Sequence, residues 1–261
     1  MDTAPAYTFR PVDGHDVIEG VWQLESGPGE DRIAPDTRCE IIFHLAEPPL
    51  EKTGEVWERQ PRHMIYGPLT RVLELKRTSP MRLLAIRLRP DGVGAITQAP
   101  RHLRNRSRDL AEIMPQPVIQ ALVDAAQQPL ADFAAAAGKL LRDPSPASPA
   151  GARVRASMAR LEQNPALRPS ALARAAHVSI RTLDRDFMRR TGLTPGEFLQ
   201  ISRYHLARQA IRNGTGSLSD IAMETGYADQ AHMTREFRRM AGQTPRLKRG
   251  EDASDIFYST G

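Results

Sequence analysis

Apolar residues follow two different periods along this chain of 261 residues, and the change of period predicts two domains. Up to about residue 100, short apolar runs alternate with proline, glycine and aspartate, which is typical of an antiparallel sandwich or barrel. A short helix is expected to begin within Gly92–Thr97, after the last strand. The runs predicted as strands are Ile18–Leu24, Cys39–Leu45, Glu55–Arg59, His63–Tyr66, Val72–Leu75 and Leu83–Leu88.

The period changes to three and four residues between Pro117 and Arg142, which predicts a helix that Pro129 divides into two. The apolar face of this helical region could pack either on the rest of its own domain or on a second subunit. Asp143–Ala152 reads DPSPASPAGA, and we predict a linker there because prolines and serines do not continue a helix. The predicted domains are therefore 1–142 and 153–249, followed by an acidic tail at 250–261.

Six helices are predicted beyond the linker from the spacing of apolar residues and from start and stop signals. The first covers about Arg153–Gln163, and the fourth is the longest, ending near Asn213. Thr194–Glu197 and Ser217–Asp220 read as capping boxes. The residues expected to start or end the helices are Pro169, Ser179, Gly192, Thr194, Gly214, Ser217, Gly226, Asp229 and Gly242.

A segment of eleven residues occurs twice in this helical part, at an offset of fifty residues. Arg185–Pro195 reads RDFMRRTGLTP and Arg235–Pro245 reads REFRRMAGQTP, with six identical positions. Such a repeat marks a duplicated supersecondary unit, here a helix, a short turn and a second helix. Because arginine lies on the open face of each second helix, we expect the pair to enter two successive major grooves of DNA.

The charge distribution agrees with that expectation. The chain carries a net charge of +5, but residues 1–150 hold 18 basic and 20 acidic side chains, and residues 151–250 hold 18 basic and 8 acidic ones. The basic character therefore belongs to the repeat region, which indicates a polyanion-binding domain beside a nearly neutral one. The alternative is a generic solvated surface rich in arginine.

The single cysteine, Cys39, cannot form a disulfide within the chain, which fits a reducing compartment. No apolar run approaches the roughly 20 residues that span a bilayer, and the first residues lack an apolar signal core. We therefore expect a cytoplasmic protein without a membrane partner.

The helical part resembles a known family. SIRTLDRDFMRRTGLTP, RYHLARQAIRNG and SDIAMETGYADQAHMTREFRRMAGQTP are similar to the DNA-binding domain of AraC/XylS-type transcriptional regulators, over roughly residues 153–249. The resemblance implies two helix-turn-helix units on a rigid connecting helix, with recognition helices about 34 Å apart on one face of the DNA. Two residues depart from the family pattern: Asp184 on the first recognition helix, and Arg168 where a capping Ser or Thr is common.

The resemblance also implies a set of DNA-binding residues, most of which the helical periodicity places on the same open faces. Arginine can bond guanine and glutamine can bond adenine in bidentate fashion. A surface salt bridge is the alternative for Arg185 and Arg235. Arg189, Arg203 and Arg239 are expected to bind phosphates or to pair within the protein. The residues expected near bases or adjacent phosphates are Arg181, Thr182, Arg185, Gln230, Ala231, Thr234 and Arg235.

The N-terminal part has a weaker resemblance, carried by PDTRCEIIFHL, MIYGPLT and LLAIRLRPDGVGAI, to a cupin-like sensory domain that precedes such DNA-binding domains. It implies a small β-barrel with trailing helices. Cupin metal sites need closely spaced histidines, whereas His15, His44, His63 and His102 stand apart, so we expect no metal and no cofactor. The candidate pocket residues are Trp22, Glu40, His44 and Arg87.

We therefore expect an α+β protein of two domains: a cupin-like N-terminal β-barrel with trailing helices, and an all-α C-terminal domain with two helix-turn-helix units. The expected function is sequence-specific transcriptional regulation, without enzymatic activity, through double-stranded promoter DNA. RNA polymerase contact, a small-molecule effector and a homodimer are left open. The alternatives are a cupin-like metalloenzyme domain fused to a DNA-binding module, and a protein that binds nucleic acid without sequence preference.

Overall fold

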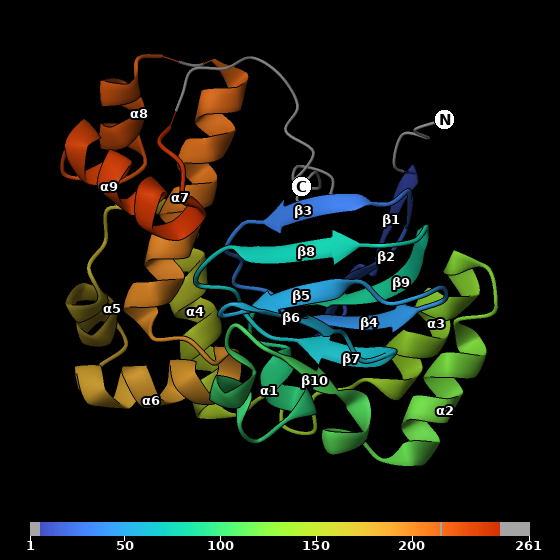
Figure 1. Cartoon of the computed structure of the whole chain (residues 1–261). Coiled ribbons are helices and arrows are strands. Elements are labelled where there is room, and N and C mark those ends of the chain that lie inside the picture. The colour runs from blue at the N-terminus through green and yellow to red at the C-terminus, as the bar shows by residue number, and fades with distance from the viewer. Residues whose placement is uncertain (1–5, 215, 246–261) are drawn as a thin grey trace.

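The computed structural model of the chain describes residues 6–214 and 216–245, with sheets in the N-terminal part and helices in the C-terminal part (Figure 1). The predicted acidic tail at 250–261 lies outside the described residues, as do the basic residues Arg246, Lys248 and Arg249. In the part of the chain that is described, no helix combines the length and apolar character needed to cross a membrane.

Among the described residues, ten antiparallel strands form two sheets. The larger sheet has the order β1-β2-β9-β4-β7-β10, and the smaller one β3-β8-β5-β6. The strands are β1 (Ala6–Pro11), β2 (Ile18–Ser26), β3 (Gly29–Ile33), β4 (Glu40–His44), β5 (Leu50–Thr53), β6 (Val56–Arg59), β7 (His63–Tyr66), β8 (Leu73–Arg77), β9 (Met81–Leu88) and β10 (Ser107–Asp109).

The closed barrel expected from the sequence is not formed by the described strands. Both edges of β2 are occupied, one by β1 and the other by β9. β3 follows β2 directly but finds no free edge on it, and pairs with β8 in the second sheet instead. The architecture is therefore α+β, with two sheets that face each other across a small apolar cluster that includes Ile33, Met64 and Leu75.

Successive side chains along a strand point to opposite faces of the sheet, so the sequence of each strand decides which residues face the helices and which face the second sheet. In β4, Ile41 and Phe43 point to the helices, whereas Glu40 and His44 point to the space between the sheets. The helices on that face are α2 (Gln116–Ala125) and α3 (Leu130–Leu140), divided by Pro129 as predicted. Their apolar faces pack on the chain's own sheet, where Phe133 meets Phe43 edge-on at 5.8 Å between ring centroids.

Three shorter helical segments follow β9: α1 (Val93–Ile96) and the 3-10 helices η1 (Pro100–Leu103) and η2 (Leu110–Glu112). α1 and η1 pack against the C-terminal part, whereas η2 packs on β7 and α2. The C-terminal helices are α4 (Pro149–Gln163), α5 (Pro169–Ala175), α6 (Ile180–Thr191), α7 (Pro195–Asn213), α8 (Leu218–Glu224) and α9 (Gln230–Ala241). α4 begins inside the predicted linker, because Ser148 caps it and proline suits the first helical position.

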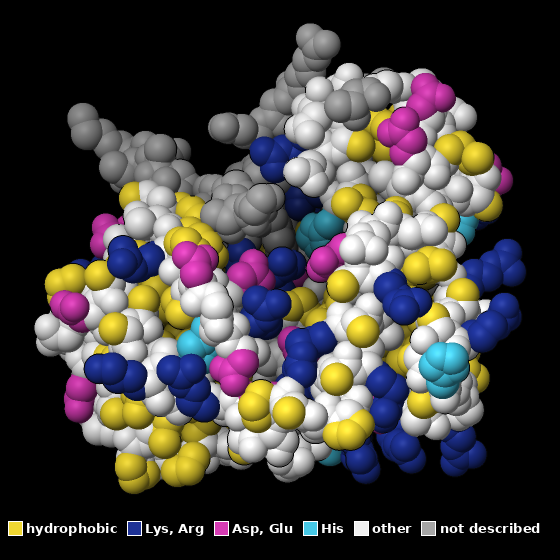
Figure 2. Space-filling view, turned by 180° about the vertical axis from the view of Figure 1, so that it is seen from behind, with side chains coloured by type: hydrophobic (Ala, Val, Ile, Leu, Met, Phe, Trp, Pro, Cys, Tyr) yellow, Lys and Arg dark blue, Asp and Glu magenta, His cyan; other side chains and the backbone are white. Residues whose placement is uncertain are grey.

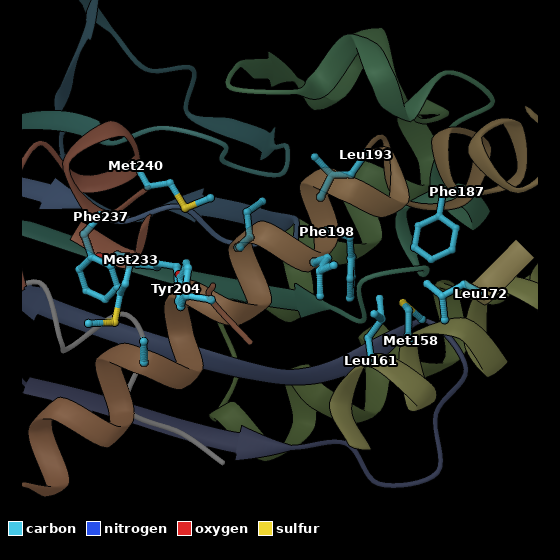
Figure 3. Close-up of a cluster of buried hydrophobic side chains, with 14 of the residues drawn as sticks. Met158, Leu161, Leu172, Phe187, Leu193, Phe198, Tyr204, Met233, Phe237 and Met240 are labelled. Carbon is cyan, nitrogen blue, oxygen red and sulfur yellow. The ribbon is translucent and has the colours of Figure 1, made fainter. Parts of the chain in front are cut away.

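α7 connects two similar groups of helices, with α5 and α6 at its start and α8 and α9 at its end (Figure 1). Two groups of buried side chains lie along it (Figure 3). Phe187 of α6 packs edge-on against Phe198 at 5.9 Å, and Phe237 of α9 packs against Tyr204 at 4.8 Å. α7 therefore serves as the common support that fixes how far apart α6 and α9 lie.

Candidate nucleic-acid interface

α6 and α9 occupy equivalent positions in the duplicated unit, and the same local signals form both. Ser179 accepts a hydrogen bond from the backbone of Thr182, and Asp229 does so from that of His232. Each helix ends at a glycine in the left-handed region, Gly192 at φ 75° and Gly242 at φ 67°. The two helices therefore begin and end at corresponding residues of the repeat.

On α6, the residues expected to face outward do so. Arg181, Arg185 and Arg189 are exposed, and Thr182 is half-buried, while Leu183 and Phe187 lie in the core. The oxygen atoms of the Thr182 and Ser179 hydroxyls lie 2.9 Å apart. Asp184, the departure from the family pattern, is half-buried on the same helix.

On α9, Gln230, Ala231 and Arg235 are exposed and Thr234 is half-buried. Within the described ranges, neither Arg185 nor Arg235 forms an ion pair, so the surface salt bridge considered for these two side chains is not found there. Figure 2 shows Lys and Arg side chains gathered along the outer lower edge of the helical half, on the right of that view. The two helices thus present guanidinium groups to solvent.

Three further arginines named from the sequence differ in their surroundings. Arg203 of α7 is half-buried and its Nε donates to the carbonyl oxygen of Pro165 at 2.7 Å, and burial lowers its pKa. Arg239 is exposed and its Nη2 lies 2.7 Å from Glu236, whose hydrogen bonds raise the pKa of that arginine. Arg203 and Arg239 therefore have partners within the protein, whereas Arg189 is exposed without an ion pair among the described residues.

The C-terminal half of α6 packs against α1 and η1 of the N-terminal part. A Cβ on Gly94 would come within 2.9 Å of the Cα of Arg190, so the two backbones nearly touch. The Arg190 guanidinium lies 2.5 Å from Asp143 and 3.8 Å from Asp91, and Arg155 also reaches Asp91 at 3.1 Å. The sequence alone does not predict this cluster, because its members are far apart in the chain, and the repeat that contains Arg190 gives no sign of its acidic partners.

The four candidate pocket residues line one cavity of about 70 Å³ between the two sheets, together with Asp36 and Arg38. Glu40 is held from two sides, by the Trp22 indole at 2.9 Å and by the Arg87 guanidinium at 2.8 Å. Burial lowers the pKa of His44 to about 4, so its ring is neutral at pH 7. A cavity of this size has room for several water molecules or a very small ligand.

Metal binding and thiol chemistry both depend on how His, Cys, Asp and Glu side chains are placed. In the described ranges, no three His, Cys, Asp or Glu residues are grouped as a metal ion would require. Cys39 directly precedes β4 and is buried, and burial raises the pKa of its thiol well above the usual value. A thiolate nucleophile needs the opposite environment, exposed and electropositive.

Comparison with known proteins adds family matches for both parts. Residues 172–250 match the family model described as a helix-turn-helix domain, and residues 15–109 match one described as a domain of unknown function (DUF6597). Two curated relatives are HTH-type transcriptional activators RhaS. The one from Escherichia fergusonii is 40% identical over 85 residues, and the one from Enterobacter sp. strain 638 is 40% identical over 78 residues.

These matches cover only part of each chain. They cover 32% and 30% of this chain, and 31% and 28% of the two relatives, so the chain spans less than a third of their length. Among solved structures, ToxT from Vibrio cholerae is 10% identical with a TM-score of 0.47, over 99% of this chain and 100% of that one. The DNA-binding domain of AdpA, solved with a target DNA, is 26% identical with a TM-score of 0.33, over 38% and 87%.

Proposed function

We propose that this chain, whose C-terminal part is a helix-turn-helix domain of the AraC/XylS type, is a transcriptional regulator that binds a specific promoter sequence. The observation that carries the proposal is the pair of equivalent helices, α6 and α9, supported at the two ends of α7 with exposed arginines. Such a pair suits two successive major grooves on one face of the duplex.

The base-reading residues that we propose are the exposed ones near the start of each helix. Arg181 and Arg185 on α6, and Gln230 and Arg235 on α9, have the donors that recognise guanine and adenine edges. Thr182, Ala231 and Thr234 lie between them and suit contacts with the thymine methyl group or with phosphates. Arg189 suits a phosphate, while Arg203 and Arg239 would have to give up hydrogen bonds within the protein to do the same.

The proposal is tested by selecting duplexes from a random library with the purified full-length protein. Arg235→Ala should weaken binding to the selected duplex by about 1–3 kcal/mol and relax the base preference at one position. Arg185→Ala should do the same at a position one helical turn away. Arg62→Ala, an exposed arginine of the N-terminal part, is the matched control and should change neither quantity.

Two results would contradict this assignment. If Arg235→Ala weakened all duplexes equally, Arg235 would bind a phosphate and not a base. A wild-type protein that enriched no common sequence would favour the alternative of a protein that binds nucleic acid without sequence preference.

For the N-terminal part, we propose a sensory role in which a small effector enters the cavity lined by Trp22, Glu40, His44 and Arg87. An effector changes DNA affinity only if it binds one conformation of the whole protein better than another. Trp57 is the second of the two tryptophans, so a Trp57→Phe variant leaves Trp22 as the only indole reporter. A candidate compound should change the Trp22 fluorescence and the DNA affinity over the same concentration range.

The cupin-like description of this part, homodimer formation and contact with RNA polymerase remain predictions from the sequence. The enzyme alternative requires a metal, and metal analysis of the purified protein distinguishes it. Stoichiometric iron, zinc or manganese would favour a metalloenzyme domain fused to the DNA-binding module.

A further inference from the structure

A short segment of the N-terminal part concentrates positive charge next to the helical domain. Residues 101–108 read RHLRNRSR and contain four arginines and one histidine. Leu103 is buried and anchors the segment, while Arg101, Arg104 and Arg106 are exposed. The segment runs from η1 into β10, and it lies at the boundary between the sheets and the helical domain (Figure 1). We call it the basic segment.

The backbone of the basic segment is fixed by contacts with the loop after β7. Asn105, at φ 53°, accepts a hydrogen bond from the backbone of Thr70 at 2.7 Å and donates one to its hydroxyl at 2.9 Å. A Cβ on Gly67 would lie 2.0 Å from the carbonyl oxygen of Leu103, so the two backbones are in close contact. The arginines therefore project from a rigid support, which lowers the entropy cost of binding a partner.

The basic segment reaches both recognition helices. Arg101 lines the same surface hollow as Arg185 and Arg189 of α6. Arg106 and Arg108 line a second hollow together with Arg238 and Arg239 of α9. The segment therefore continues a row of guanidinium groups from the end of one helix to the end of the other.

Two of its arginines have no ionic partner in the described ranges. Arg104 pairs with Glu197 at 2.6 Å and Arg108 lies 3.4 Å from Glu112. Arg101 and Arg106 form no ion pair with any described residue. The hollow shared with α9 is also lined by Glu51, Glu58 and Glu74, which offset part of the positive charge there. The exposed guanidinium groups of Arg101 and Arg106 remain able to bind a polyanion that lies along the row.

We propose that the basic segment is a DNA-backbone contact: Arg101 and Arg106 bind phosphates of the duplex between the two grooves that α6 and α9 enter. This inference rests on the proposed function, because the same duplex supplies the phosphates. It assigns to the N-terminal part a direct share in DNA affinity, besides any effector role. The contact carries no base information, because phosphates are the same in every sequence.

The test compares the full-length wild type with the double variant Arg101→Gln/Arg106→Gln on the duplex selected by the wild type. The logarithm of the association constant is measured against the logarithm of salt concentration. Each phosphate contact contributes about 0.9 to the slope, so the double variant should lose about 1.8 and bind about tenfold or more weakly at physiological salt. Its base preference should stay that of the wild type, and hydroxyl-radical protection should be lost only between the two grooves.

Arg62→Gln/Arg82→Gln removes the same charge from exposed positions of the N-terminal part outside the basic segment, and serves as the matched control. The inference is overturned if the double variant keeps the wild-type slope and protection, or if the control changes them equally. In either case the proposed function is still supported if the wild type selects a specific duplex sequence. A wild type that selects no duplex sequence overturns both.

Discussion

At the scale of single residues, burial and neighbouring charges together decide the charge state of side chains in the N-terminal cavity. Arg87 is buried, and although burial alone would lower its pKa, the nearby carboxylates of Glu40 and Asp36 raise it, so the side chain stays charged. His44 lines the same cavity, is only 2% exposed and is neutral at pH 7. Trp22, Glu40, His44 and Arg87 were candidate pocket residues from the sequence. That they line one cavity, and which of them are charged, depends on strands that come together only in the folded protein.

The lowered pKa of His44 predicts a loss of stability in acid. The unfolded chain binds a proton at the ordinary histidine pKa of 6.5, whereas the folded chain does so only near pH 4. The folded state therefore loses stability as the pH falls from about 6.5 towards 4, by about 2 kcal/mol at pH 5.

Urea unfolding at pH 7.5 and at pH 5 measures this loss, and His44→Gln should reduce the difference between the two conditions. His102→Gln, at an exposed histidine, is the control and should leave it unchanged. An equal pH dependence for His44→Gln and the wild type would show that His44 does not titrate as predicted.

At the scale of elements, local signals predicted the helices far better than the strands. The capping boxes at Thr194 and Ser217 form as expected, and Arg168 indeed provides no side-chain cap for α5. Four strands were not predicted: β1, β3, β5 and β10. β1, β3 and β10 lie at sheet edges, and the sequences of β3 and β10, GEDRI and SRD, carry little of the apolar alternation on which strand prediction depends.

The glycines that end α6 and α9 allow the cost of a left-handed backbone to be separated from the cost of a clash with a neighbouring element. Gly192 and Gly242 both lie in the left-handed region, so Gly→Ala costs about 1–2 kcal/mol at either position from the backbone alone. A Cβ on Gly192 would also come within 2.8 Å of the backbone oxygen of Pro100, whereas one on Gly242 would meet only the tip of Arg32 at 3.0 Å.

Gly192→Ala should therefore lower the free energy of unfolding more than Gly242→Ala, and it should loosen the contact between α6 and η1. Urea denaturation measures the first effect, and hydrogen exchange of the η1 amides the second. Equal losses in the two variants would indicate that the backbone of η1 moves away at no cost.

At the scale of the whole molecule, the two parts are joined by buried charges. Asp91 is 1% exposed and lies within 3.1 Å of Arg155 and 3.8 Å of Arg190, which also pairs with Asp143. On the other side, the His205 ring of α7 lies 2.7 Å from the carbonyl oxygen of Pro35. The N-terminal part is thus attached both to α6, one of the two recognition helices, and to α7, which fixes how far apart α6 and α9 lie.

Asp91→Asn should weaken this attachment, because it leaves two arginine side chains with less opposing charge in a buried site. Breaking a buried pair costs about 3–5 kcal/mol, and Asp143 offsets part of it here. Calorimetry should show a lower Tm and a separation of the unfolding of the two parts. Asp13→Asn, at an exposed loop, is the control. A single transition at the wild-type Tm would mean that Asp91 does not couple them.

The sequence by itself determined the helices, their caps and the outward arginines, because each of these depends on residues within a few turns of one another. It also determined the duplicated unit, because a repeat is visible in the order of residues whatever their distance in space. Only the tertiary structure decided that the sheets stay open, that Trp22, Glu40, His44 and Arg87 line one cavity, and that Arg101 lies beside Arg185. Such contacts join residues distant in the chain, and they arise only when every element has found its packing partner.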